Sequence, residues 1–124
     1  MILLPASVRV FVAIEPTNLR YSFEGLSNLV RSKLAEDPLS GHLFVFINRR
    51  RNQVKLLLWT RGGFTILHKR LERGTFAFVK RDDSTSSRTE LDVHELAMML
   101  EGIEADDVDL KPRWSPKALA AARR

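Results

Sequence analysis

The sequence contains no cysteine among its 124 residues. A chain without cysteine forms no disulfide and offers no thiolate to a metal ion, which excludes disulfide-stapled and zinc–cysteine folds together. Its apolar runs are far shorter than the roughly 20 residues that a membrane-spanning helix needs. The first residues also lack the basic start and long apolar stretch of a signal peptide. By elimination we expect a cytoplasmic protein with no membrane partner.

Residues that carry catalysis or bind metals are also sparse. The three histidines, His42, His68 and His94, are far apart, and no HxH or HExxH pattern joins them. There is no GxSxG motif, and Gly62-Gly63 is not followed by the Lys-Ser or Lys-Thr of a phosphate-binding loop. The sequence therefore predicts a protein that is not an enzyme, with no cofactor and no metal site.

Acidic residues are almost missing from residues 40–80, where Glu72 is the sole carboxylate. This stretch holds nearly half of the chain's 20 Lys and Arg residues, and the whole chain has a formal net charge of +5. Residues 89–110 show the opposite bias, with many acids and no Lys or Arg. Such asymmetry favours an anionic partner or self-assembly into a homo-oligomer, and two solvated faces are the alternative reading.

The basic stretch also has the strongest strand signals in the chain. Gly, Asn and Arg turns separate its short apolar runs at the spacing of hairpins, which predicts an antiparallel β-meander. In the middle hairpin we place Trp59 opposite Phe64 and Leu57 opposite Ile66. With this register, the basic residues of the two strands lie at the hairpin end far from Gly62-Gly63. The predicted strands are Leu43–Ile47, Val54–Thr60, Phe64–Leu67 and Thr75–Val79.

Apolar residues occupy both faces of these predicted strands, which is typical of a sheet that is covered on both sides. One cover is expected to be a helix of this chain, and the other is a second helix or a partner. A strand over Val8–Ile14 precedes a helix that Thr17 or Asn18 caps and that Asp37-Pro38 stops. Gly25 inside that helix suggests close packing against the sheet.

After the meander, residues 81–88 form a predicted polar loop. Asp92 and Glu95 then have the spacing of a capping box at the start of a second helix, which Gly102 ends. The apolar face of this helix is predicted to be Val93, Leu96, Ala97 and Leu100. The predicted fold is thus a single α+β domain over residues 1–104. Residues 105–124 are predicted to be a linker and a short basic C-terminal helix or tail, with Pro116 at the first helical position.

Nucleic-acid binding is the function that the charge pattern favours. Three consecutive arginines at a predicted hairpin tip are placed to contact phosphates, and further cations along the sheet edge add contacts. Trp59, Phe64, Phe76 and Phe78 could stack on bases, although aromatic residues at strand spacing are more often core. The predicted nucleic-acid-binding residues are Arg49, Arg50, Arg51, Lys55, Lys69, Arg70 and Arg73.

Several segments together resemble a known family. The pattern LPxxVRVFVA, PTxLRxSFxGL, DPxSGHLFVFxNRR, VKxLxW, GGFxxxxKRLERGxF and ELAMMLEGI is similar to the Orf-two-like accessory proteins, called TnpB, of insertion-sequence-sixty-six-type bacterial transposable elements. The likeness covers nearly the whole chain to about Ile103. The chain departs from the family at Asn18, Tyr21 and Arg61, where Asp, Lys and Asp are usual.

The resemblance implies a bacterial protein encoded beside a separate transposase and a second small accessory protein, both of which become expected partners. Together with the charge pattern it predicts a non-catalytic accessory factor that helps assemble transposase with DNA. Two alternatives stay open. One is an adaptor that binds transposase without touching DNA, and the other is a regulator that binds nucleic acid, including RNA.

Overall fold

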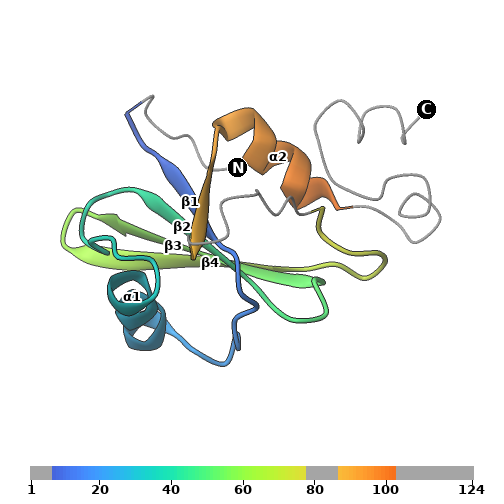
Figure 1. The fold of residues 1–124 in the computed structure, drawn as a ribbon, viewed down its shortest axis with the longest axis horizontal. Coiled ribbons are helices and arrows are strands. Elements are labelled where there is room, and N and C mark those ends of the chain that lie inside the picture. Colours follow the sequence, from blue (N-terminus) through green and yellow to red (C-terminus); the bar gives the residue numbers. More distant parts are fainter. Residues whose placement is uncertain (1–6, 78–86, 103–124) are drawn as a thin grey trace.

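The computed structural model describes residues 7–77 and 87–102 of the chain. Within them, five strands form one sheet in the order β4–β3–β2–β1–β5, and helices lie on its two opposite faces (Figure 1). The elements in chain order are β1 (Val10–Ala13), α1 (Phe23–Ser32), β2 (Leu43–Ile47), β3 (Gln53–Thr60), β4 (Gly63–Arg70), β5 (Arg88–Leu91) and α2 (Val93–Glu101). The predicted α+β class, with one helix before the meander and one after it, is confirmed.

The strand β1 lies inside the sheet, between β2 and β5. It pairs in parallel with β2, to which α1 connects it, and antiparallel with β5. The pairs β2–β3 and β3–β4 are antiparallel, so these three strands form the predicted meander. Because β1 and β2 run in parallel, the segments that follow them emerge at the same edge of the sheet.

The middle hairpin has the predicted register. Trp59 pairs with Phe64 and Leu57 with Ile66, and the rings of Trp59 and Phe64 meet edge to face with centroids 4.9 Å apart. The two-residue loop is Arg61-Gly62, with φ of 37° and 83°. Positive φ at both positions is the geometry that matches the twist of a tight hairpin, and glycine adopts it without strain.

The predicted strand Thr75–Val79 is wrong over its described part. Thr75 makes an isolated bridge and residues 76–77 are not in a strand, while residues 78–79 lie outside the described residues. The backbone N–H of Phe76 instead donates to the carbonyl of Arg51 at 2.6 Å. Phe76 is fully buried, so this segment ties the end of the meander to the β2–β3 turn and adds no further strand.

Both faces of the sheet are covered, as the apolar runs predicted, and the second cover is a helix of the same chain. Phe11, Phe44 and Leu57 face α1, which contributes Leu26 and Val30. The opposite face packs on Leu96 and Met99 of α2, together with Phe76. The strand residues in that second core are Val10, Val12, Leu43, Val45, Ile47, Val54, Leu56 and Leu91.

Helix α1 is shorter than predicted at both ends. It begins after Ser22, because the preceding segment forms a separate turn in which the Asn18 side chain accepts the backbone N–H of Arg20 at 3.0 Å. It ends at Ser32, well before Pro38, and Ala35 has a φ of 54°. Neither the predicted cap at Thr17 or Asn18 nor the predicted stop at Asp37-Pro38 is correct.

Gly25 does pack closely, but not against the sheet as predicted. A Cβ at this position would lie 2.8 Å from the Tyr21 ring. The glycine therefore makes room for the side chain that precedes the helix.

Helix α2 has the predicted ends. Asp92 accepts the backbone N–H of Glu95 at 2.7 Å, and the Glu95 side chain accepts the backbone N–H of Asp92 at 3.0 Å. Gly102 follows as the C-cap with a φ of 83°. The predicted apolar face is partly wrong, because Met99 is buried with Leu96, whereas Val93 is 51% exposed.

The strand β5 was not predicted. It begins at Arg88, the last residue of the predicted polar loop, of which residues 81–86 lie outside the described residues. Its polar residues hid its alternation, in which Thr89 and Leu91 are buried toward α2. The predicted short helix within residues 105–124 lies outside the described residues. Neither described helix is long and apolar enough to cross a membrane.

Candidate nucleic-acid interface

The turn between β2 and β3 presents the three consecutive arginines. Its backbone is held by Asn48, whose Oδ1 accepts the N–H groups of Asn52 and Gln53, both at 3.0 Å. The Asn48 Nδ2 donates to the Asn52 side chain at 2.8 Å. Arg49, Arg50 and Arg51 are all exposed, so a side-chain amide shapes the loop while the guanidinium groups face outward.

Two more arginines reach the same end of the sheet. Arg70 is the last residue of β4 and pairs with Gln53, the first residue of β3. The backbone N–H of Leu71 donates to the carbonyl of Asn52 at 2.8 Å, which brings the following segment against the turn. We call this end of the sheet the basic end. It comprises Arg49, Arg50, Arg51, Arg70 and Arg73.

The two predicted lysines lie elsewhere, on opposite faces of the sheet. The Lys55 ammonium group donates to the carbonyl of Tyr21 at 2.8 Å, beside α1. The Lys69 ammonium group donates to the carbonyl of Leu100 at 2.8 Å, at the end of α2. Arg70 pairs with Glu72 at 3.1 Å, although both side chains are largely exposed. The structure thus brings five of the seven predicted residues together and gives both lysines a main-chain partner.

An open cleft of about 550 Å³ lies beside the basic end. It forms where the segments that follow β1 and β2 run side by side, with the Thr17 N–H donating to the Ile47 carbonyl at 2.8 Å. The cleft lies beyond the carboxyl ends of the parallel strands β1 and β2. The cleft is lined by Pro16, Thr17, Asn18, Leu19, Arg20, Asn48, Arg49 and Gln53.

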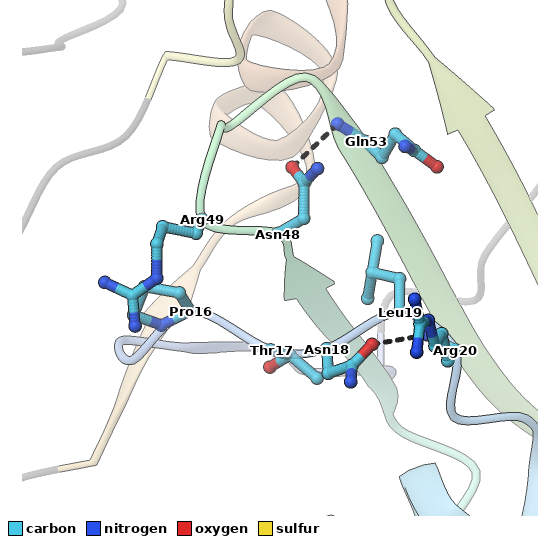
Figure 2. Close-up of a pocket in the computed structure, with 8 residues that line it drawn as sticks. All are labelled: Pro16, Thr17, Asn18, Leu19, Arg20, Asn48, Arg49 and Gln53. Carbon is cyan, nitrogen blue, oxygen red and sulfur yellow. Dashed lines mark hydrogen bonds between the residues drawn. The ribbon is translucent and has the colours of Figure 1, made fainter.

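Arg20 and Arg49 stand at opposite ends of this cleft (Figure 2). Arg20 was not among the predicted site residues, because the sequence pattern put it on the outer face of a helix starting near Thr17. The overlooked signal is Asn18, whose side chain closes a local turn with the second residue after it. Because of this local turn, the Pro16–Arg20 segment forms one wall of the cleft.

Two other arginines are paired with carboxylates. Arg9 donates to Glu90 at 2.7 Å, and Arg88 pairs with Glu36 at 2.9 Å. The hydrogen bond from Arg9 holds the pKa of Glu90 below its ordinary value, against a smaller opposing effect of burial. Both guanidinium groups also lie over the Phe11 ring, at 5.0 and 5.2 Å from its centroid. These contacts give both guanidinium groups carboxylate and aromatic partners within the protein.

The aromatic candidates divide in a similar way. Phe76 is buried in the core, Phe78 lies outside the described residues, and Trp59 and Phe64 pack against each other far from the basic end. His42 accepts the backbone N–H of Arg9 at 3.0 Å, and His68 contacts the Gln53 side chain at 2.9 Å. Among residues 7–77 and 87–102, no group of three or more His, Asp or Glu side chains could hold a metal ion.

A small α+β domain with a basic end and an adjoining cleft is the class of protein that this geometry defines. The family described as "IS66 Orf2 like protein" matches residues 8–109, slightly beyond the likeness seen in the sequence, and the chain belongs to it. Membership of this family indicates an accessory role in transposition.

Two curated relatives match the chain over most of their own length. The chain is 30% identical over 113 residues to the Sinorhizobium fredii protein described as uncharacterized protein y4jC, covering 91% of this chain and 94% of the relative. It is 32% identical over 99 residues to uncharacterized protein y4hO of the same species, covering 79% and 83%. No solved structure matches the chain.

Proposed function

We propose that this protein is a non-catalytic accessory factor that binds DNA through its basic end and helps assemble transposase with the ends of a transposable element. The family supports the accessory role. The DNA contact is supported by the clustering of arginines from the β2–β3 turn and from the end of β4, which are far apart in the sequence. The cognate transposase and the second small accessory protein are the partners that such a factor would meet.

The arrangement suits contact with phosphates. Arg49, Arg50 and Arg73 are exposed and have no carboxylate partner among the described residues. Guanidinium groups on a turn make charge-assisted, often bidentate hydrogen bonds to phosphate oxygens. Such contacts release counterions, so binding should weaken steeply as salt is raised. Because the contacts involve phosphates and come from no helix, we expect little sequence preference from the isolated protein.

A charge-reversal variant at Arg49, Arg50 and Arg51 tests the DNA contact. Each lost phosphate contact flattens the dependence of log affinity on log salt by about 0.9 for duplex DNA. The triple variant should therefore lower retention of terminal-repeat DNA in a gel-shift titration and flatten the slope by up to about 3. Unchanged retention and slope would refute the contact.

A matched control reverses three exposed cations elsewhere, Arg31, Lys33 and Arg61. It changes the net charge by the same amount but leaves the basic end intact. If both triple variants lose the same affinity, overall charge is responsible and the basic end has no particular role.

The adaptor alternative makes a different prediction. If the basic end docks on an acidic surface of transposase, the protein should capture purified transposase in nuclease-treated extract, and the Arg49–Arg51 triple variant should lose that capture. Retention of single-stranded RNA in preference to duplex DNA would instead indicate the regulator.

A further inference from the structure

The cleft beside the basic end has a shape and lining suited to binding a particular kind of anionic ligand. Its two walls are the Pro16–Arg20 segment and the start of the β2–β3 turn, and none of its lining residues is acidic. Neither Arg20 nor Arg49 has an ion-pair partner in the described part of the chain. Both guanidinium groups therefore face a ligand-sized space with their charge uncompensated.

The hydrogen-bonding groups that line the cleft also favour an anionic ligand. The Asn18 oxygen is already used by the Arg20 N–H, at 3.0 Å. The Asn48 oxygen accepts two backbone N–H groups of the turn, and the Gln53 oxygen is 2.9 Å from His68. Each of these acceptors already has at least one partner, and the Thr17 hydroxyl can donate or accept. The remaining side-chain groups are donors: the amide nitrogens of Asn18 and Gln53 and both guanidinium groups. A site rich in donors selects a ligand rich in acceptors.

We propose that this cleft seats one nucleotide of an unpaired DNA strand, with Arg49 and Arg20 neutralising the phosphates on its two sides. The inference rests on the proposed DNA binding and adds which form of DNA the protein recognises. Because the two arginines lie at opposite ends of the cleft, each can contact a different phosphate (Figure 2).

The size and lining of the cleft support a nucleotide over a bare phosphate. A volume of about 550 Å³ lies within the roughly 300–1,000 Å³ of typical small-molecule sites and far exceeds a phosphate group. Pro16 and Leu19 give it an apolar surface against which a sugar or base can pack. A paired base could not enter, because its edge and both faces are occupied within the duplex.

The first test measures binding of a fluorescein-labelled dT12 strand by anisotropy, using the full chain. Arg20→Ala and Arg49→Ala should each weaken binding roughly tenfold at moderate salt and flatten the salt slope by about 0.7. Arg31→Ala removes an equally exposed arginine outside the cleft and should match the wild type. If Arg20→Ala behaves like Arg31→Ala, the cleft does not hold the strand and the proposal is overturned.

A second variant separates the cleft from charge at its mouth. Gln53→Glu retains a side-chain oxygen for the contact with His68 but replaces the amide donor in the cleft by a carboxylate. It should weaken dT12 binding at least as much as Arg20→Ala while leaving the thermal midpoint unchanged. Wild-type affinity in this variant would show that the strand bypasses the cleft, which overturns the proposal.

The dinucleotide pdTdT distinguishes failure of this proposal from failure of the proposed function. Added to the isotope-labelled protein, it should shift the backbone amide signals of residues 17–20 and 48–53. If those shifts occur although the wild type retains no duplex DNA, the cleft assignment holds and the proposed duplex contact fails. If the Arg49–Arg51 reversal abolishes duplex binding but pdTdT shifts no signal of the cleft residues, the proposed duplex contact holds and the cleft assignment fails.

Discussion

The protein contains two pairs of arginines in different surroundings. Arg9 and Arg88 lie at the β1–β5 side of the sheet, where Glu90 and Glu36 neutralise them and the Phe11 ring lies beneath them. Arg20 and Arg49 lie beyond the ends of β1 and β2, where no cleft residue is acidic. The first pair joins segments about 50 to 80 residues apart in the sequence, whereas the side chains of the second pair join no two segments of residues 7–77 and 87–102.

The difference shows how the same side chain serves two purposes. A guanidinium group opposite a carboxylate satisfies its donors internally and fixes two segments together. One without such a partner is solvated until an external anion replaces water. Composition does not distinguish the two kinds. The topology, which brings β5 beside β1, places Glu90 beside Arg9 and brings Arg88 to Glu36.

The largest effect on stability is expected at Arg88. Its side chain is 33% exposed, donates to the Leu34 carbonyl at 2.7 Å and pairs with Glu36, which is 20% exposed. Arg88→Ala leaves a mostly buried carboxylate without its partner, so it should lower the free energy of unfolding by about 2 kcal/mol. Urea denaturation followed by circular dichroism measures this loss.

Arg49→Ala is the matched comparison in the same assay and should leave the urea midpoint unchanged, because Arg49 is exposed and outside the core. An equal loss in both variants would erase the distinction between fold-stabilising and ligand-facing arginines.

Asn48 connects the two roles, because it is a positioning residue whose side chain holds the turn that carries Arg49. Asn48→Ala removes three hydrogen bonds and should cost about 1–2 kcal/mol of stability while also weakening dT12 binding. Asn48→Asp keeps the two bonds to backbone N–H groups and should recover most of the stability. A turn that binds dT12 normally in Asn48→Ala would show that this side chain does not position the arginines.

The smallest effect is expected at the exposed Arg9–Glu90 pair. The pKa of Glu90 lies below its ordinary value of 4.5 in the folded protein, because Arg9 stabilises the charged carboxylate. The pair therefore contributes stability above pH 4.5 and loses it as pH falls through the lower, folded-state pKa. Glu90→Gln should be slightly less stable than the wild type at neutral pH and equal to it in acid. A difference that grows in acid would contradict this sign.

Much of the fold follows from local patterns in the sequence. The register of the β3–β4 hairpin, the capping box of α2 and the burial of both sheet faces were predicted from residue types and spacing alone. These features depend on near neighbours, such as Trp59 facing Phe64 across a two-residue turn. The sequence therefore determines them almost independently of the rest of the molecule.

The remainder depends on long-range contacts that no local pattern reports. The strand β5 is identifiable only once β1 is available to pair with it, because its Arg and Glu side chains resemble a loop. Lys55 and Lys69 are close in register, yet they face opposite helices, which depends on how α1 and α2 pack. The cleft requires the parallel β1–β2 pairing, so Arg20 and Arg49 could not be assigned to the same cleft from sequence alone.

The position of β1 has a consequence for synthesis of the protein. This strand is synthesised before the other four described strands, yet one of its edges pairs with residues 88–91, which are synthesised last among the five strands. Throughout elongation, an apolar strand with unpaired backbone groups stays open to adventitious pairing with other chains. Pairing of β5 with β1 covers that edge, and the Arg9–Glu90 and Arg88–Glu36 ion pairs then stabilise the paired strands. The nascent chain cannot form these contacts before residues 88–91 are synthesised.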